Sequence, residues 1–361
     1  MLTSKLYSLY SKNVEDCRKE EKKMNNYIEK VTVSIEEAKE KIKHLIAEDS
    51  LVFPIFTDLH TEDIDHEYMK RLIPVLEIIT DNIDYDAVIN LGDNFGMLGR
   101  NIHITNDDLK ARFERVFDTV YEAAKHPVIN VNGNHDAPGT DFFNPDFWNS
   151  IVKYRYGNTM TVYDDSGCYY YIDYEKANAR LVILSLPYDS DIESEMPTPI
   201  WGFGKKQLMW LKETALNTDK DVIVISHVPF FYEYTGDMES TLGVWTGSEA
   251  KVSYISALCG WIEDVDEAVE IIKEYDNRPD TKLVACLSGH MHSDSFWLPG
   301  EEKNGIKNPL PCHQVVTTAT CFTGNVESEI GISIDVAVWT PSKRELNMIR
   351  IGDGEDRNLI C

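Results

Sequence analysis

Runs of consecutive apolar residues, bounded by polar turns, divide most of the chain into short segments. Several runs are rich in β-branched residues and do not alternate with polar ones, which is typical of strands buried on both faces. Segments with apolar residues at helical spacing lie between them, at about 67–82, 106–125 and 205–217. This alternation predicts a layered α/β fold. The predicted strands are Leu51–Thr57, Ala87–Leu91, Val128–Val131, Arg180–Leu186, Asp221–Ser226 and Lys282–Ser288.

The first fifty residues follow a different, Lys/Glu-rich helical pattern. Ser34 and Glu37 fit a capping box, with Ser34 as the N-cap of a helix. Apolar residues then recur on one helical face, and the same spacing extends backwards. We expect an N-terminal helical extension, residues 1–50, that packs on a main domain of residues 51–361; a short oligomerising coiled coil is the alternative. The apolar face comprises Ile28, Val31, Ile35, Ala38, Ile42 and Leu45.

Two stretches of the main domain are predicted to be insertions, at about 137–167 and 230–279. The second contains a predicted helix at Val265–Tyr275. Loops at the carboxyl ends of strands carry specificity in open α/β sheets, so we expect these insertions to set the choice of substrate. A hairpin of Tyr169–Tyr174 with Arg180–Leu186 is also predicted, followed by closing strands at Gln314–Thr318, Ile332–Val338 and Leu346–Ile351.

The charge and the cysteines narrow the classes of function. The formal net charge of −26 disfavours long nucleic acid as a partner, because such a chain repels phosphate backbones. The seven cysteines are scattered, odd in number and free of CxxC pairs, which argues against disulfides and thiolate metal sites. No apolar run approaches the roughly 20 residues of a membrane helix, and no signal-peptide core is present. We therefore expect a cytoplasmic protein with no membrane partner.

Five polar segments follow predicted strands and contain five of the ten histidines. On an extended chain, residues two apart point the same way, so Asp58 and His60 can face one metal ion. His290 and His292 are again two residues apart. A carboxylate such as Asp93 has two oxygens, each of which can hold one ion. The segments are Asp58-Leu59-His60, Gly92-Asp93-Asn94, Gly133-Asn134-His135-Asp136, Ser226-His227-Val228-Pro229 and Gly289-His290-Met291-His292.

The third and fourth segments complete the candidate site. The side-chain oxygen of Asn134 can bind a hard cation, whereas His135 can point towards a leaving group, with Asp136 holding its other nitrogen. His227 ends a strand that Pro229 prevents from continuing. Each segment alone is compatible with a structural role, but five in order indicate a dinuclear metal centre. Its nitrogen and oxygen ligands suit Mn, Fe, Zn or Ni and leave the identity of the two divalent ions open.

Together these segments resemble the motifs of the calcineurin-like metallophosphoesterase superfamily: D-x-H, GD-x-x-D/N, GNH-D/E, a strand-end His and GH-x-H. The resemblance spans roughly Leu51–Asp294, and Gly96 stands where the family often has a second Asp. It implies a metallophosphatase-type layered sandwich of two mixed β-sheets flanked by helices. The implied ligands are Asp58, His60 and His292 for one metal and Asn134, His227 and His290 for the other, with Asp93 bridging, His135 as proton donor and Asp136 orienting it.

The expected function is a dinuclear metal-dependent phosphoesterase that hydrolyses phosphomonoesters or phosphodiesters. The resemblance implies in-line attack by a metal-bridging hydroxide. The acidic charge favours a small-molecule or nucleotide phosphate ester as substrate, and a phosphoprotein remains open. The alternative is a catalytically weak scaffold of the same fold that binds a protein partner, although no expected ligand is missing. The oligomeric state is not predicted.

Overall fold

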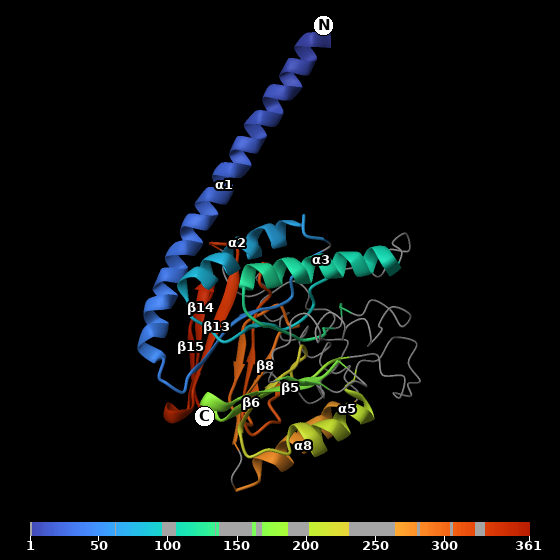
Figure 1. The fold of residues 1–361 in the computed structure, drawn as a ribbon, viewed down its shortest axis with the longest axis vertical. Helices are drawn as coiled ribbons and strands as arrows, with labels where there is room; N and C mark the ends of the chain where they lie inside the picture. The colour runs from blue at the N-terminus through green and yellow to red at the C-terminus, as the bar shows by residue number, and fades with distance from the viewer. Residues whose placement is uncertain are drawn as a thin grey trace.

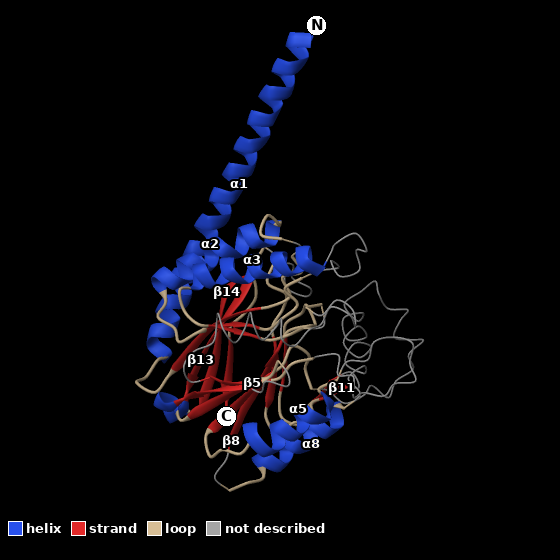
Figure 2. Ribbon diagram, turned by 45° about the vertical axis from the view of Figure 1, so that its right-hand side comes forward, coloured by secondary structure: helices blue, strands red, loops and turns tan. Residues whose placement is uncertain are grey.

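The chain forms two facing β-sheets with helices on their outer sides (Figures 1 and 2). Both sheets are mixed, which confirms the predicted α/β sandwich. The computed structural model describes residues 2–61, 63–95, 106–133, 135–136, 161–163, 168–186, 202–230, 264–279, 282–303, 306–321 and 329–361.

The first sheet has the strand order β15-β14-β13-β1-β2-β3. The parallel trio β1-β2-β3 brings three carboxyl ends to one edge, while β13, β14 and β15 continue the sheet in antiparallel fashion. Helices α2 (Glu67–Asn82) and α3 (Asn106–Ala124) pack beside each other along it. The strands are β1 (Leu51–Phe56), β2 (Val88–Asn90), β3 (Val128–Asn130), β13 (Ser333–Thr340), β14 (Glu345–Gly352) and β15 (Arg357–Ile360).

The second sheet has the order β4-β5-β6-β7-β8-β12-β9, with β6, β7, β8 and β12 parallel. Helices α5 (Gly204–Trp210), continued by a π-helical turn, and α8 (Val265–Asp276) cover its outer face. A small hairpin joins β10 (Glu302–Lys303) to β11 (Ile306–Lys307). The strands are β4 (Thr161–Tyr163), β5 (Tyr170–Tyr174), β6 (Ala179–Ile183), β7 (Asp221–Ile225), β8 (Lys282–Ser288), β9 (Ser295–Trp297) and β12 (His313–Val316).

Strand β7 shows why the predicted strands are continuous apolar runs, without polar residues at every second position. Ile223 and Ile225 belong to the core between the sheets, whereas Val222 and Val224 belong to the core under α5 and α8. Both faces of the strand are therefore buried, as a continuous apolar run predicts.

Helix α1 (Leu2–Leu45) is one continuous helix whose N-terminal half extends away from the body (Figure 1). Its C-terminal half packs against β14 and α2. The predicted apolar face is confirmed: its middle residues are buried in the main core, and Ile28 and Leu45 are partly buried against it. The predicted helix start is wrong, because Ser34 lies inside α1 and its hydroxyl accepts a hydrogen bond from the Gly352 N–H.

The six predicted strands are present, and so are the helices predicted at about 67–82, 106–125 and 205–217 and at Val265–Tyr275; most of their ends differ from the prediction by one or a few residues. The hairpin and the closing strands are also confirmed, as β5–β6 and β12, β13 and β14. The short strands β4, β9, β10, β11 and β15 were not predicted. Most of the two predicted insertions, at 137–160, 164–167 and 231–263, lies outside the described residues. The insertions stay predictions, and so does the division of the chain into an N-terminal extension and a main domain at residue 50.

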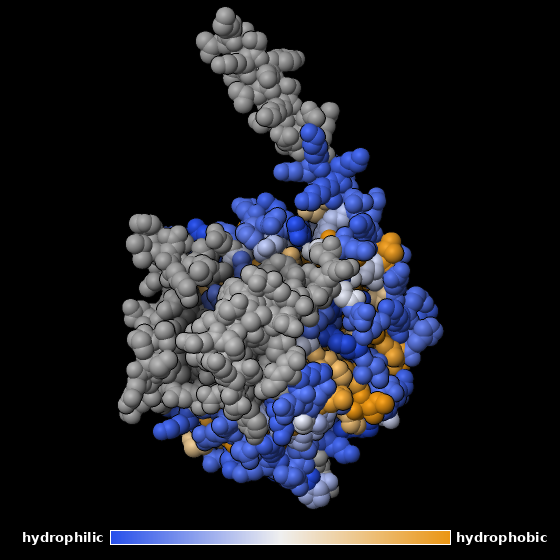
Figure 3. All heavy atoms as spheres, turned by 180° about the vertical axis from the view of Figure 1, so that it is seen from behind, coloured by the Kyte–Doolittle hydropathy of each residue, from blue (hydrophilic) through white to orange (hydrophobic). Residues whose placement is uncertain are grey.

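The described surface is predominantly hydrophilic on the face drawn in Figure 3, with apolar residues in small separate patches. This agrees with an excess of acidic side chains that are solvated. Among the described residues, no helix combines the length and the apolar character that crossing a membrane requires.

Candidate metal centre

Five strands end at the predicted site: the parallel trio β1-β2-β3 of the first sheet and the parallel pair β7-β8 of the second. Asp58 and Asp93 follow β1 and β2 of the first sheet, and His227 and His290 follow β7 and β8 of the second. Backbone hydrogen bonds join the loops: the Asp58 N–H donates to the Gly92 carbonyl over 2.9 Å, and the Gly289 N–H donates to the His227 carbonyl over 3.0 Å. Segments from 58 to 292 in the sequence thus meet at one place.

The described candidate ligands fall into overlapping groups. Within each group the nearest nitrogen or carboxylate oxygen atoms lie within 4.8 Å of one another, a spacing at which they could share an ion. The groups are Asp58, His60 and His292; His60, Asp93 and His135; and Asp93, His227 and His290. Asn134, the remaining predicted ligand, lies outside the described residues.

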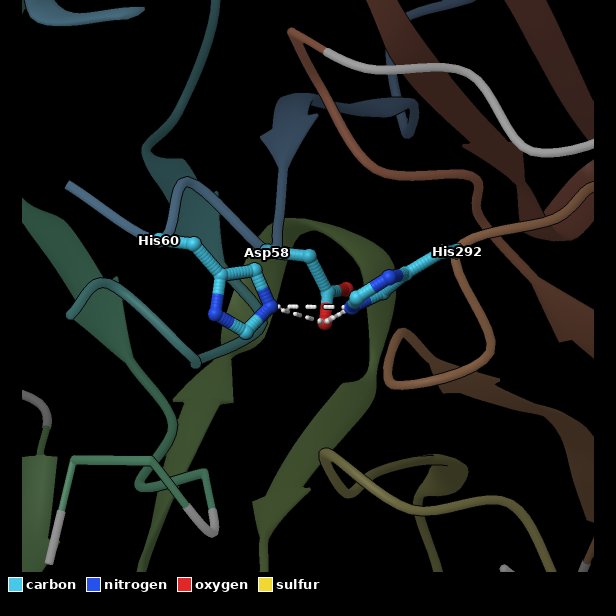
Figure 4. A group of neighbouring side chains, drawn as sticks. All are labelled: Asp58, His60 and His292. Atoms are coloured by element: carbon cyan, nitrogen blue, oxygen red, sulfur yellow. Dashed lines mark hydrogen bonds and ion pairs between the residues drawn. The ribbon is translucent and has the colours of Figure 1, made fainter. Parts of the chain in front are cut away.

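The first group converges on one oxygen of Asp58 (Figure 4). Asp58 Oδ1 lies 3.1 Å from His292 Nε2 and 3.7 Å from His60 Nε2, and the two imidazole nitrogens are 2.9 Å apart. His60 enters from the loop after β1 and His292 from the loop after β8, so the group joins both sheets.

The two oxygens of Asp58 differ in their hydrogen bonds. Oδ2 accepts the Thr57 hydroxyl over 2.7 Å and the His290 N–H over 2.9 Å. Oδ1 is buried and accepts no hydrogen bond from the described residues. A buried oxygen without a donor is costly unless a cation satisfies it, so this atom fits a metal ligand. Thr57 was not predicted as a site residue. The signal in the sequence was a hydroxyl residue directly before a carboxylate at the end of a strand.

The group of Asp93, His227 and His290 is buried throughout. Asp93 Oδ2 lies 3.1 Å from His227 Nε2, which in turn lies 3.3 Å from His290 Nδ1. His227 Nδ1 lies 2.8 Å from the Leu91 carbonyl, which can only accept, so this nitrogen carries the proton. Once Nε2 loses its own proton, its lone pair faces Asp93, as a metal-binding imidazole requires.

Asp93 lies between the groups. Its Oδ2 is 3.9 Å from His60 Nε2 and 4.0 Å from His135 Nε2, in addition to its approach to His227. Its Oδ1 accepts the His135 backbone N–H over 2.7 Å. One carboxylate is therefore within reach of both candidate ion positions.

His135 and Asp136 are arranged differently from the prediction. The His135 side chain is 31% exposed, and its ring centre lies 4.7 Å from that of His60, at the open side of the site. Asp136 is buried, and its carboxylate accepts the backbone N–H groups of Asp93, Asn94 and Gly133 over 2.9, 2.9 and 3.0 Å. The expected bond to the His135 imidazole is not among the hydrogen bonds that Asp136 makes with the described residues. Asp136 instead ties the loop after β2 to the loop after β3.

The carboxylates and imidazoles shift one another's pKa. Burial would raise the pKa of Asp58 and of Asp93, but the neighbouring histidines hold both pKa values well below normal. Burial would lower the pKa of His227, yet Asp93 and Asp58 raise it to about 9. Burial and the charge of His227 lower the pKa of His290 to about 3. Without a metal, His227 is protonated at neutral pH, so binding a cation through Nε2 displaces a proton.

Burial and the nearby Asp93 raise the pKa of Asp136 to about 7. This carboxyl group therefore differs from the two candidate metal-binding carboxylates, whose pKa values are lowered. Asp136 therefore holds the loops together, whereas Asp58 and Asp93 face the site.

The site backbone adopts left-handed conformations. Asp58, His60, Asp93, His290 and His292 have φ of 52°, 43°, 52°, 67° and 51°, and they are five of the eight described non-glycine residues with positive φ. Such conformations cost energy and concentrate at functional sites. Asp58 and His60 thus reach one group of ligands through a tight turn and not through extended chain, whereas His290 and His292 lie in different groups.

Glycine is required where the loops approach the carboxylates. A Cβ atom on Gly133 would overlap Asp93 Oδ1, and one on Gly289 would overlap the Thr57 hydroxyl and lie 2.7 Å from Asp58 Oδ2. The glycines of the GNH and GHMH segments therefore make room for the hydrogen-bonded side of each carboxylate.

Comparisons with known proteins found one matching family model and several similar solved structures. The family model of the calcineurin-like phosphoesterases matches residues 52–294. A dimetal phosphatase from Danio rerio is 14% identical, with a TM-score of 0.55 and coverage of 86% of this chain and 98% of that chain. A 5'-nucleotidase precursor from Thermus thermophilus is 11% identical, with a TM-score of 0.37 and coverage of 86% and 54%. No curated protein matches the chain.

Proposed function

Because the chain belongs to the calcineurin-like phosphoesterase family, we propose that its strand-end site binds two divalent metal ions and hydrolyses phosphate monoesters or diesters. The observation that carries the proposal is the position of Asp93, shared by two groups of ligand atoms. A buried structural site for a single ion would not need a carboxylate between two clusters of imidazoles.

The ligand atoms divide between two ions. Asp58, His60 and His292 would hold one, and His227 and His290, with Asn134 from the sequence, would hold the other. Asp93 would contribute to both. The buried oxygen of Asp58 and the fixed tautomer of His227 support this assignment. The nitrogen and oxygen donors suit Mn, Fe, Zn or Ni.

Two bound divalent cations would activate an attacking water and neutralise the charge on the phosphoryl oxygens. His135 then has a separate task. Its half-exposed ring lies beside His60, where it can donate a proton to the leaving oxygen, a contribution of about 10²–10⁴ in rate. The bond from its own N–H to Asp93 fixes its backbone relative to the metal ligands. Asp136 supports His135 and Asp93 by joining the loops that carry them.

Substrates with a small charged group fit this chain best. The net charge of −26 opposes long polyanions in general, while the bound cations would attract a single phosphate ester locally. We propose a small-molecule or nucleotide phosphate ester as the substrate class.

Hydrolysis of p-nitrophenyl phosphate and bis-p-nitrophenyl phosphate tests the proposal. The protein is stripped with a chelator and then supplied with Mn²⁺, Zn²⁺, Fe²⁺ or Ni²⁺. We expect loss of activity on chelation and recovery with at least one ion; the preferred substrate distinguishes monoesterase from diesterase. Asp93→Asn should abolish the recovered activity, whereas Asp84→Asn, at an exposed carboxylate before β2, should retain it. No metal-dependent turnover on either ester would favour a binding scaffold.

A further inference from the structure

We propose that Asp294, held by Arg350, is a positioning residue that keeps His292 in place for the ion bound by Asp58, His60 and His292. Arg350 lies on β14, beyond the end of the family match at residue 294. The C-terminal strands would then contribute to metal binding without contacting the metal. This inference rests on the proposed two-metal site.

Direct contacts link Arg350 to the loop of His292. Arg350 Nη2 donates to Asp294 Oδ1 over 2.8 Å, and the same oxygen accepts the Thr318 N–H over 3.1 Å. The Thr318 hydroxyl donates to the His292 carbonyl over 3.0 Å. The chain of contacts thus runs from β14 to the backbone of the imidazole that approaches Asp58.

His292 needs such support because its backbone is strained. Its φ of 51° is a left-handed conformation that β-carbon-bearing residues adopt at a cost, and its side chain is 25% exposed, so packing alone does not hold it. A conformation of this kind persists only where its surroundings fix it. The hydrogen bond to the His292 carbonyl, backed by the partly buried ion pair of Arg350 and Asp294, provides that constraint.

The ion pair is built into the core. The Arg350 side chain is only 2% exposed, and it also donates to Asp335 Oδ1 over 3.0 Å. Arg357 contacts both Asp335 and Asp294. Two guanidinium groups therefore face two carboxylates, which balances the charge that burial would otherwise penalise.

Gly354, in the turn between β14 and β15, covers this pair. Its φ is +116°, and a Cβ atom there would lie 2.7 Å from Arg350 Nη1 and 3.1 Å from Asp294 Oδ2. The turn can approach so closely only with glycine, and its approach leaves Arg350 little freedom to leave Asp294.

Asp294→Asn tests the role, because asparagine keeps an acceptor for Thr318 but loses the ion pair. Metal-free protein is titrated with Mn²⁺ by calorimetry, and low-temperature electron paramagnetic resonance reports whether two ions are spin-coupled. In the variant we expect one ion to bind as in the wild type and the other roughly 10–100-fold more weakly, with the signal of an uncoupled ion at low loading.

Asp221→Asn is the matched control. Asp221 pairs with Arg344 over 2.6 Å and is 18% exposed, like Asp294, but it lies at the start of β7, at the end opposite the site. The Asp221→Asn variant should bind both ions as the wild type does. Thr318→Val provides a second test that leaves every charge in place, since it removes only the hydroxyl bonded to the His292 carbonyl; Thr318→Ser should restore binding.

Wild-type affinities for both ions in Asp294→Asn and Thr318→Val would overturn the positioning role and leave the two-metal proposal intact. If Asp294→Asn fails to fold, as judged by circular dichroism, Thr318→Val still tests the contact through which Asp294 would act, and wild-type affinities for both ions in that variant would overturn the positioning role. A wild-type protein that binds fewer than two ions would overturn the proposed function and this inference with it.

Discussion

Each central carboxylate has one oxygen bound to the protein and the other facing the candidate ions. Asp58 uses Oδ2 for the Thr57 hydroxyl and the His290 N–H, and Asp93 uses Oδ1 for the His135 N–H. The opposite oxygens are those closest to the imidazoles. Hydrogen bonds of this kind orient metal ligands and typically change metal affinity by about 10–100-fold when they are lost.

Gly133→Ala should therefore impair metal binding. The added Cβ would overlap Asp93 Oδ1 and displace the shared carboxylate, so we expect metal affinity to fall by roughly 10–100-fold. Calorimetric titration with Mn²⁺ measures the change. Gly300→Ala is the control: a Cβ there meets no atom within 4 Å, so the strain of alanine at a φ of +66° stays local and metal affinity should be unchanged. Equal affinity in the two variants would show that the close approach at Gly133 is unimportant.

His135→Ala should separate chemistry from metal binding. We expect both ions to be retained and kcat to fall by about 10²–10⁴, most strongly for alkyl esters, whose leaving oxygen needs a proton. His126→Ala, which removes an imidazole packed against Tyr85, should leave kcat unchanged. Wild-type turnover of an alkyl phosphate by His135→Ala would exclude the proton-donor role.

The sequence identified the candidate ligands, because each follows an apolar run that a strand explains. It did not reveal the left-handed turns at Asp58 and His292, since φ at a non-glycine residue depends on surrounding contacts. It also misplaced Asp136: adjacency suggested a bond to His135, whereas the fold brings three backbone N–H groups to its carboxylate.

The secondary-structure elements place the site by ending together. Strands buried on both faces were predictable from their apolar runs, and so were α2 and α3 from their helical spacing. Strands β9 and β15 were not, because short strands at sheet edges carry little pattern. The capping box failed for a non-local reason: Ser34 bonds to Gly352, 318 residues away in sequence, while α1 runs through it.

Helix α1 should stabilise the fold through its buried face. Ile35 is fully buried in the main core, so Ile35→Ala should lower the free energy of unfolding by about 2–5 kcal/mol. Val33, on the same helix, is 55% exposed, and Val33→Ala should change the free energy of unfolding by about 0.5 kcal/mol or less. Urea unfolding followed by circular dichroism compares them. Similar, small changes would mean that the docked half of α1 contributes little.

At the scale of the whole molecule, buried acidic side chains are stabilised by guanidinium groups from other strands of the chain. Asp335 is the central example. Burial would raise its pKa, but Arg350 and Arg357 outweigh burial and lower it. A carboxyl group whose folded pKa is depressed stabilises the protein above its unfolded pKa, about 3.9, and that stabilisation is lost as the pH falls through the folded pKa.

Asp335→Asn should thus weaken the protein at neutral pH and flatten the fall in stability below about pH 4. Removing one partner leaves buried guanidinium charge, at a cost of about 3–5 kcal/mol. Urea midpoints measured from pH 7 to pH 3 provide the comparison, with Asp84→Asn, at an exposed carboxylate, as control. A parallel pH profile in Asp335→Asn and the wild type would exclude this linkage.

The number of metal ions bound per chain is the sharpest test of a two-metal centre. Metal-free protein is equilibrated with Mn²⁺ and dialysed, and bound metal is counted by mass spectrometry alongside Asp93→Asn. We predict two ions per wild-type chain and fewer than two in the variant, because Asp93 serves both positions. One ion or none in the wild type, or two in both proteins, would contradict a centre built around a shared Asp93.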